Sequence, residues 1–228
     1  MKTTEPTRWH RFPDPQALAR AAAAAVLEEA REAIAVRGEF RVVLAGGRTP
    51  ELAYRMLAQT EADWPRWQVY FGDERCLPRD DPERNSQMAR TAWLDRVSIP
   101  VGNVHAIPAE LGPEVAAVRY AERVRSALPF DLVLLGMGED GHTASLFPGH
   151  VHPQGELVHP VYQAPKPPPE RVSLSSAALG EARRILILVS GLGKREAVHR
   201  WRSGEALPVA GIQGPAGVDV LIDRDADG

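Results

Sequence analysis

Short apolar runs alternate along the chain with segments whose apolar and polar positions have a helical spacing. Runs of strand length occupy residues 40–45, 67–71, 104–107, 130–135, 171–175, 184–189 and 218–222. Helical patterns occupy residues 17–36, 50–57, 87–97, 113–128 and 194–201. Strands that alternate with helices predict an α/β fold, with a mostly parallel, doubly wound sheet and helices on both of its faces.

The alternation continues along the whole chain without an internal repeat or a linker. We therefore expect residues 1–228 to form a single α/β domain. Asp14 and Pro15 are typical of a helix start, and Gly38 of a helix end, so the alanine-rich segment between them predicts a packed helix. Residues 149–169 are rich in proline and predict a long loop.

Composition excludes several classes of partner. The net charge of −3 gives no long-range attraction to nucleic acid or to an anionic membrane. Cys76 is the single cysteine, so an intramolecular disulfide is excluded, and no apolar run approaches the roughly 20 residues that span a bilayer. Residues 1–11 contain no apolar signal core. We expect a cytoplasmic protein that acts as a monomer or a small homo-oligomer.

The segment 130–148 combines a buried strand with a polar loop. The apolar run 130–135 ends at Gly136 and is followed by two more glycines, two carboxylates, His142 and two hydroxyl side chains. Open α/β sheets bind their ligands at the carboxyl ends of their strands, and glycines let the backbone come close to a substrate. The unperturbed pKa of histidine lies near neutrality, which suits His142 to proton transfer. This loop is therefore the predicted active site.

The same loop matches the spacing of a dinucleotide-binding fingerprint through Gly136, Gly138 and Gly141. Such a fingerprint begins a long helix, whereas Pro148 and Gly149 prevent one here. A nicotinamide cofactor is therefore not expected, and no other cofactor is predicted.

Polar residues also follow other predicted strands. A glycine pair and a threonine at residues 46–49 precede a helix, which is the arrangement of an anion site built from backbone amides and a helix dipole. A tight turn without a ligand explains that segment equally well. Asp73, Glu74 and Arg75 follow the next strand, and Lys194 follows a later one. Gathered at one edge of a sheet, these groups would bind a phosphorylated small molecule.

Two groups of residues have metal-ligating side chains. His150, His152 and His159 lie in the proline-rich segment, but their spacing fits no common zinc pattern, which favours surface histidines. The second group, Asp80, Asp81 and Glu83, is interpreted as a helix cap and as solvated charges. No metal site is predicted.

Several motifs resemble the 6-phosphogluconolactonase family. They are Gly-Gly-Arg-Thr-Pro at 46–50, Gly-Asp-Glu-Arg at 72–75, Asn-Ser at 85–86, Pro-Lys-Pro-Pro-Pro at 165–169, Arg-Val-Ser-Leu at 171–174 and Gly-Lys at 193–194. The most specific one is Gly-Met-Gly-Glu-Asp-Gly-His-Thr-Ala-Ser-Leu-Phe-Pro at 136–148. The resemblance implies a Rossmann-like α/β fold and hydrolysis of 6-phospho-D-glucono-1,5-lactone in the oxidative pentose phosphate pathway.

Glucosamine-6-phosphate deaminases resemble this family and share its fold, so the fold alone does not separate the two activities. The deaminase-like loop carries a glutamate where Phe147 stands here, and a tyrosine where Arg75 stands. Deaminases also favour His and Tyr in the region of Asn85 and Ser86. All three differences favour the lactonase.

The resemblance also implies roles for individual residues. His142 would act as the general base, with Asp140 orienting the site; Asp140 is too close in sequence to be assumed its hydrogen-bond partner. Asp73 matches a catalytic position of the deaminases. The residues implied in binding the substrate and its phosphate are Gly46, Gly47, Arg48, Thr49, Arg75, Arg171 and Lys194.

Two further alternatives remain at this stage. Ser145 follows His142 by three residues and would make a covalent mechanism conceivable, although the nucleophile-elbow pattern is absent. A non-catalytic phosphosugar-binding protein would keep the anion site, but would typically lose the histidine that this chain retains.

Overall fold

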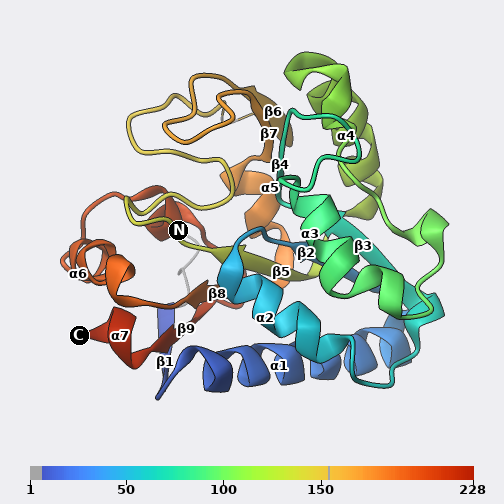
Figure 1. Cartoon of the computed structure of the whole chain (residues 1–228), viewed down its shortest axis with the longest axis horizontal. Coiled ribbons are helices and arrows are strands. Elements are labelled where there is room, and N and C mark those ends of the chain that lie inside the picture. The colour runs from blue at the N-terminus through green and yellow to red at the C-terminus, as the bar shows by residue number, and fades with distance from the viewer. Residues whose placement is uncertain (1–6, 154) are drawn as a thin grey trace.

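The computed structural model describes residues 7–153 and 155–228 (Figure 1). Residues 1–6, which belong to the segment without a predicted signal core, lie outside the described residues. In the described part of the chain the strands are β1 (Thr7–Phe12), β2 (Phe40–Leu44), β3 (Trp67–Phe71), β4 (Asp73–Arg75), β5 (Phe130–Gly136), β6 (Val158–Val161), β7 (Arg171–Leu174), β8 (Ala182–Val189) and β9 (Val218–Asp223).

The helices lie between these strands. The α-helices are α1 (Pro15–Arg37), α2 (Arg48–Leu57), α3 (Asn85–Ala92), α4 (Pro113–Ala127), α5 (Ser176–Gly180), α6 (Arg195–Arg202) and α7 (Arg224–Asp227). Short 3-10 helices are η1 (Trp64–Arg66), η2 (Leu94–Arg96), η3 (Val101–Asn103), η4 (Ala109–Leu111), η5 (Leu192–Lys194) and η6 (Pro208–Gly211).

Within the described residues the main sheet has six strands, in the order β1-β9-β8-β5-β2-β3, and every pair is parallel. The chain moves outward from β2 to β3 and later in the opposite direction from β5 to β8 and β9. The change of direction falls between β2 and β5, and such a switch point is where doubly wound sheets bind their ligands. The predicted α/β fold is confirmed.

Helices cover both faces of the main sheet, as predicted. Figure 1 shows α1 and α2 along one face, and α4 and α5 on the opposite side. The start of α1 is capped by Asp14, whose carboxylate accepts from the backbone of Ala17, and Gly38 ends it with φ of 80°. On the other side, the buried hydroxyl of Tyr120 in α4 bonds to the backbone of Phe71 at the end of β3.

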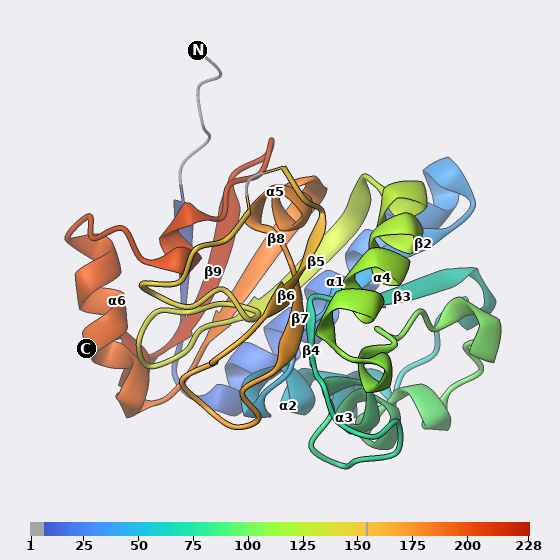
Figure 2. The ribbon, with the colours of Figure 1, turned by 90° about the horizontal axis from the view of Figure 1, so that it is seen from above.

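A second sheet, which the sequence did not predict, lies above the carboxyl ends of the main sheet (Figure 2). Its three antiparallel strands, counted in the described part of the chain, have the order β4-β7-β6. The charged residues Asp73–Arg75 therefore form a strand of their own, which pairs with residues 171–173 of β7. This pairing brings Asp73 and Arg171, which are far apart in the sequence, onto the same small sheet.

Three details of the predicted elements need correction. Residues 104–107 are not a strand, because only Val104 forms an isolated bridge, with Val69. The helix expected at 87–97 begins at Asn85, ends at Ala92 and continues as the 3-10 turn η2. The edge strand β1 was not predicted, because its six residues include two arginines and a histidine and are mostly exposed.

None of the helices in the described residues is both long and apolar enough to cross a membrane.

Candidate functional site

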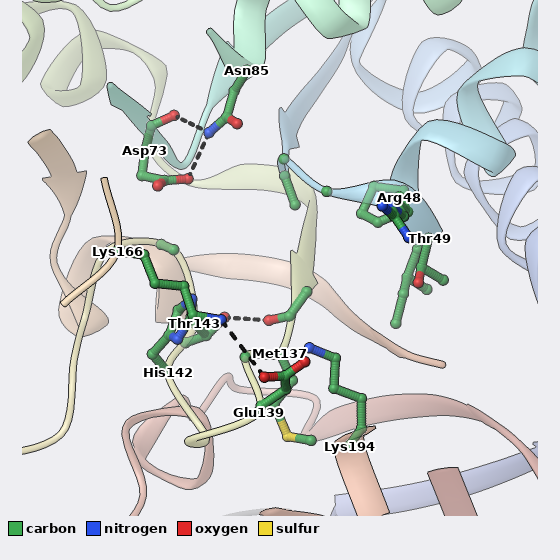
Figure 3. Close-up of a pocket in the computed structure, with 18 of the residues that line it drawn as sticks. Arg48, Thr49, Asp73, Asn85, Met137, Glu139, His142, Thr143, Lys166 and Lys194 are labelled. Carbon is green, nitrogen blue, oxygen red and sulfur yellow. Dashed lines mark hydrogen bonds and ion pairs between the residues drawn. The ribbon is translucent and has the colours of Figure 1, made fainter. Parts of the chain in front are cut away.

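A cavity of about 650 Å³ lies at the carboxyl ends of β2, β5 and β8, beneath the second sheet. Its walls come from the loops that follow these three strands, from Asp73 and Arg75 of β4, and from the proline-rich segment before β7. Figure 3 shows side chains from all of these segments directed toward a common space. The cavity therefore lies at the switch point of the sheet, where the topology favours a ligand.

The cavity collects almost all of the residues that the sequence singled out. Those that line it are Gly46, Gly47, Arg48, Thr49, Asp73, Arg75, His142, Arg171 and Lys194. Asp140 is not among the lining residues, but its carboxylate contacts Nδ1 of the His142 ring, which does line the cavity. The predicted site residues are thus one spatial cluster.

His142 and Asp140 form a close pair. Oδ1 of Asp140 lies 2.5 Å from Nδ1 of His142 and also accepts from the His142 backbone N–H at 3.2 Å. The turn at Gly141, with φ of 84°, brings the two side chains together although they are two residues apart. With Nδ1–H donating to the carboxylate, Nε2 is left as the free base of the imidazole.

The glycine at position 138 makes room for this pair. A Cβ atom there would lie 2.0 Å from Nδ1 of His142 and 2.5 Å from Oδ1 of Asp140, far inside contact distance. The backbone N–H of Gly138 donates to the carbonyl oxygen of His142 at 2.8 Å. Gly138 thus holds the imidazole against the backbone of its own loop.

The surroundings of His142 favour the neutral imidazole. Burial lowers its pKa below the usual 6.5, and this effect outweighs the attraction of the Asp140 and Asp73 carboxylates, which raise it. Burial by itself would raise the pKa of Asp140, but the His142 ring and its hydrogen bonds hold that pKa below the usual value. At neutral pH the pair therefore consists of the Asp140 carboxylate and the neutral imidazole of His142. The His142 side chain is 17% exposed.

Asp73 lies buried on the opposite wall of the cavity. Its carboxylate accepts from Oγ of Ser145 at 2.7 Å and from Nδ2 of Asn85 at 3.1 Å. Asn85 also lies against Gly46, where a Cβ atom would meet its side-chain oxygen at 2.0 Å. Ser145 is fully buried and its hydroxyl is committed to Asp73, which argues against its action as a nucleophile.

Glu74 holds Arg75 and the start of α3 in place. Its buried carboxylate accepts from the backbone N–H groups of Arg75, Asn85 and Ser86 at 2.7 to 2.9 Å. Nε of Arg84 lies 3.4 Å from the same carboxylate. Arg75 itself reaches the carbonyl oxygen of Glu83, and its buried Nε has no hydrogen-bond partner within the described residues.

Arg171 is mainly engaged with its own loop. Its guanidinium donates to the carbonyl oxygens of Lys166, Pro167 and Pro168 at 2.9 to 3.2 Å. It also lies over the Phe147 ring, 5.6 Å from the centroid. The Phe147 ring also lies 4.7 Å from the His142 ring, measured between centroids. Arg171 therefore fixes the proline-rich wall of the cavity and the aromatic support of His142.

Lys194 stands beside two residues that sequence reasoning had not assigned to the site, Lys166 and Glu139 (Figure 3). Burial lowers the pKa of Lys194, the Glu139 carboxylate raises it, and the positive charge of Lys166 lowers it again. Nζ of Lys166 lies 4.0 Å from Glu139. Lys166 lies in the motif at 165–169 and Glu139 in the motif at 136–148. These two motifs therefore contained the information that could have placed both residues in the site.

The loop after β2 presents its backbone to the cavity. Gly47 caps α2 with φ of 102°, and Arg48 and Thr49 form the first turn of that helix, whose amides are directed toward the cavity end. The hydroxyl of Tyr54 fixes the preceding residue, since it accepts from Ala45 N at 3.0 Å and donates to Ala45 O at 2.9 Å. This geometry is that of a helix N-terminus suited to an anion.

The three histidines of the proline-rich segment are not simply surface residues. His159 is buried on β6, 1% exposed, and its Nε2 lies 3.0 Å from Nδ1 of His152. Burial, followed by the charge of His152, lowers the pKa of His159 to about 4. The expectation of surface histidines is therefore wrong for His159, because β6 turns it inward. In the part of the chain that the structure describes, no three His, Cys, Asp or Glu residues are grouped to hold a metal.

Comparisons with known proteins give a consistent result. The family model described as glucosamine-6-phosphate isomerases/6-phosphogluconolactonase matches residues 13–221. The 6-phosphogluconolactonase of Streptomyces coelicolor is 40% identical, over 93% of this chain and 90% of its own length. That of Mycobacterium tuberculosis is 37% identical, over 94% of this chain and 95% of its own.

A solved structure agrees with the sequence relatives. The crystal structure of 6-phosphogluconolactonase from Thermotoga maritima superposes with a TM-score of 0.89 at 29% identity, covering 96% of this chain and 100% of that one. The resemblance of the sequence motifs, the topology of the sheet and these relatives agree. The chain belongs to the glucosamine-6-phosphate isomerase/6-phosphogluconolactonase family.

Proposed function

We propose that this protein hydrolyses 6-phospho-D-glucono-1,5-lactone to 6-phospho-D-gluconate, the second step of the oxidative pentose phosphate pathway. The observation that carries the proposal is the His142–Asp140 pair, which faces a cavity rimmed by Arg48, Arg75 and Lys194. A neutral imidazole beside a cluster of cations is what hydrolysis of a phosphorylated lactone requires. The 6-phosphogluconolactonases to which the chain is similar support the same reaction.

The chemistry is acyl transfer to water. Nε2 of His142 takes a proton from a water molecule as its oxygen attacks the lactone carbonyl carbon. The bond between that carbon and the ring oxygen then breaks, and the imidazolium returns the proton to the departing ring oxygen. Asp140 keeps Nδ1 protonated and stabilises the imidazolium while it exists. A covalent intermediate is not needed.

The oxyanion of the tetrahedral intermediate requires hydrogen-bond donors close to His142. Thr143 and Ala144 line the cavity immediately after the imidazole. Thr143 pairs with Leu146 in an isolated antiparallel bridge, whereas within the described residues the backbone N–H of Ala144 has no acceptor. Ala144 adopts φ of 47°, a conformation that is uncommon for a residue other than glycine. We assign the oxyanion to the backbone N–H of Ala144, since backbone strain of this kind accumulates at functional sites.

The phosphate is assigned to the cationic side of the cavity. Arg75 and Lys194 supply positive charge, and Gly46, Gly47, Arg48 and Thr49 supply the N-terminus of α2. Arg171 acts through the loop that it holds, because its guanidinium already donates to three carbonyl oxygens. Asp73 fixes Ser145 and Asn85 and raises the pKa of His142, so we assign it a positioning role.

Two observations separate this reaction from the deaminase alternative. The position of the deaminase glutamate is held by Phe147, which packs against His142 and brings no proton-transfer group to the site. The position of the deaminase tyrosine is held by Arg75, a cation suited to phosphate. The retained His142–Asp140 pair likewise argues against a protein that only binds phosphosugars.

The test uses the purified protein and freshly generated 6-phosphogluconolactone, with acid release followed at constant pH. The expected result is release well above spontaneous hydrolysis, and no ammonia from glucosamine 6-phosphate. Deamination at a comparable rate would overturn the lactonase assignment. Saturable binding of 6-phosphogluconate without turnover would identify a phosphosugar-binding protein instead.

The chemistry of the proposed substrate indicates the compartment in which the protein acts. We assign the reaction to one catalytic domain, residues 1–228, in the cytoplasm, since a phosphorylated sugar stays in the compartment where it is made. A net charge of −3 offers nucleic acid and anionic membranes no attraction.

A further inference from the structure

A second cavity, of about 480 Å³, lies between α3, α4 and the segment that connects them. Both helices are on the same side of the molecule (Figure 2), and the cavity contains none of the residues that line the first one. Five arginines line it: Arg79, Arg84, Arg90, Arg119 and Arg123. The size is within the range of about 300–1,000 Å³ that is usual for small-molecule sites.

The charge of this cavity is not balanced by its own walls. Glu110 supplies the sole carboxylate among the described lining residues, and that carboxylate is 2.8 Å from Nη1 of Arg84. The whole chain nevertheless has a net charge of −3, so the concentration of arginines is local. Like charges that gather in one concave surface repel one another, and a bound anion removes that repulsion.

Arg84 is a structural part of the wall. It is 1% exposed, and its guanidinium donates to Glu110 and to the carbonyl oxygen of Ile107, with Nε close to Glu74. Arg90 is partly engaged, with Nη1 3.2 Å from Asp95. By contrast, the guanidinium groups of Arg79, Arg119 and Arg123 make no hydrogen bond or ion pair within the described residues.

These arginines approach the cavity from two sides. Arg119 and Arg123 are four residues apart on α4, a spacing that places both side chains on one face of the helix. Arg90 comes from α3, and Arg79 comes from the loop before this helix. We propose that this second cavity binds a small molecule with at least two phosphate groups, one held by the α4 arginines and one by Arg79 and Arg90.

His105 provides a local reporter. It lines the cavity and stacks on Tyr70, with ring centroids 4.5 Å apart, and its Nε2 is 2.8 Å from Oε1 of Gln68. Burial lowers the pKa of His105, and the nearby charge of Arg123 lowers it further. An anion that neutralises Arg123 therefore raises the pKa of His105.

The test measures pyrophosphate binding by calorimetry at low ionic strength. The parent is compared with R119Q/R123Q and with the control R20Q/R125Q, which changes the charge equally at exposed arginines outside the cavity. In R119Q/R123Q the second cavity should bind pyrophosphate at least about tenfold more weakly than in the parent and the control, whatever the first cavity binds, because one of its two arginine pairs is gone. Circular dichroism must show the same fold in all three proteins. Equal affinities in the parent and R119Q/R123Q would overturn the proposal.

Two further measurements test how many phosphate groups the ligand needs and whether it binds in the second cavity. Orthophosphate should bind this cavity at least about tenfold more weakly than pyrophosphate, because it engages one arginine pair rather than two. Equal affinity would overturn the requirement for two phosphates. In NMR titrations, pyrophosphate should raise the pKa of His105 in the parent and not in R119Q/R123Q. An unchanged His105 in the parent would place any bound pyrophosphate elsewhere.

Discussion

Oδ1 of Asp140 lies 2.5 Å from Nδ1 of His142, although a single glycine separates the two residues in the sequence. The left-handed backbone of Gly141 folds the chain back on itself so that the carboxylate meets the ring that follows it. This contact fixes which imidazole nitrogen is free, and the position of that nitrogen determines what the site can do to a lactone.

Asp140→Asn should lower kcat by about 10–10³-fold, less than removal of the imidazole, because the ring loses its orientation and the support for its charged form. The Asp140 carboxylate raises the pKa of His142, so its removal lowers that pKa further. The acid limb of the rate profile should therefore move to lower pH. Asp80→Asn, in the exposed loop before α3, is the control and should retain the parental profile. A limb that moves to higher pH would contradict the pairing.

Gly138→Ala should disrupt the site from the backbone side. The new Cβ atom would overlap Nδ1 of His142 at 2.0 Å, so the ring must leave its position. We expect a loss of kcat close to that of a His142 substitution, with a loss of about 1–3 kcal/mol in unfolding free energy from the overlap. Gly102→Ala, where no atom lies within 4 Å, should change neither quantity. Parental kcat in Gly138→Ala would show that the ring is free to sit elsewhere.

Arg75→Ala and Lys194→Ala should each lower kcat/KM for the phosphorylated lactone by about 10–100-fold, equivalent to about 1.5–3 kcal/mol of a charge-assisted hydrogen bond. The same substitutions should hardly change the slow hydrolysis of unphosphorylated gluconolactone, because the lost contact is to phosphate. Arg66→Ala, at an exposed arginine outside the cavity, is the matched control. Equal losses with both lactones would show that these cations do not bind the phosphate.

The sequence predicted the main sheet apart from its edge strand β1, together with the longer helices, because apolar strands of five to eight residues are a strong local signal. It did not predict the second sheet. Strand β4 consists of three charged residues, Asp73–Arg75, and is defined only by its partner Arg171–Leu174, about a hundred residues later. Pairing over such a distance leaves no periodic pattern in either segment.

The chemistry was likewise predictable in part. Each site residue was named from a short motif, but the contacts between motifs were not. Ser145 bonds to Asp73, and Phe147 contacts both His142 and Arg171, through tertiary packing that spacing does not encode. Lys166 lies in the Pro-Lys-Pro-Pro-Pro motif, but it was not assigned to the site because nothing in the local pattern shows that this loop folds over the cavity. His159 was assigned to the surface because four residues of β6 give little sign of which side is buried.

Tyr54→Phe tests the support of the glycine loop. The hydroxyl makes two buried hydrogen bonds to Ala45, immediately before Gly46, and the substitution leaves that backbone without these partners. We expect a loss of about 1–3 kcal/mol in unfolding free energy, measured by urea denaturation. Tyr162→Phe removes an exposed hydroxyl and should cost less than about 0.5 kcal/mol. Equal costs for the two would mean that the buried pair does not stabilise the loop.

We propose that neutral His142 is the base of lactone hydrolysis, and kcat/KM measured against pH for the parent and for His142→Asn tests this role. Spontaneous hydrolysis of the lactone must be subtracted at each pH. Since burial lowers the pKa of His142, the parental activity should persist below pH ~6.5 and decline only at lower pH. His142→Asn should remain folded, still bind 6-phosphogluconate, and lose about 10²–10⁴-fold in rate. A folded His142→Asn protein with near-parental turnover would remove His142 from the mechanism and make Asp73 the candidate base.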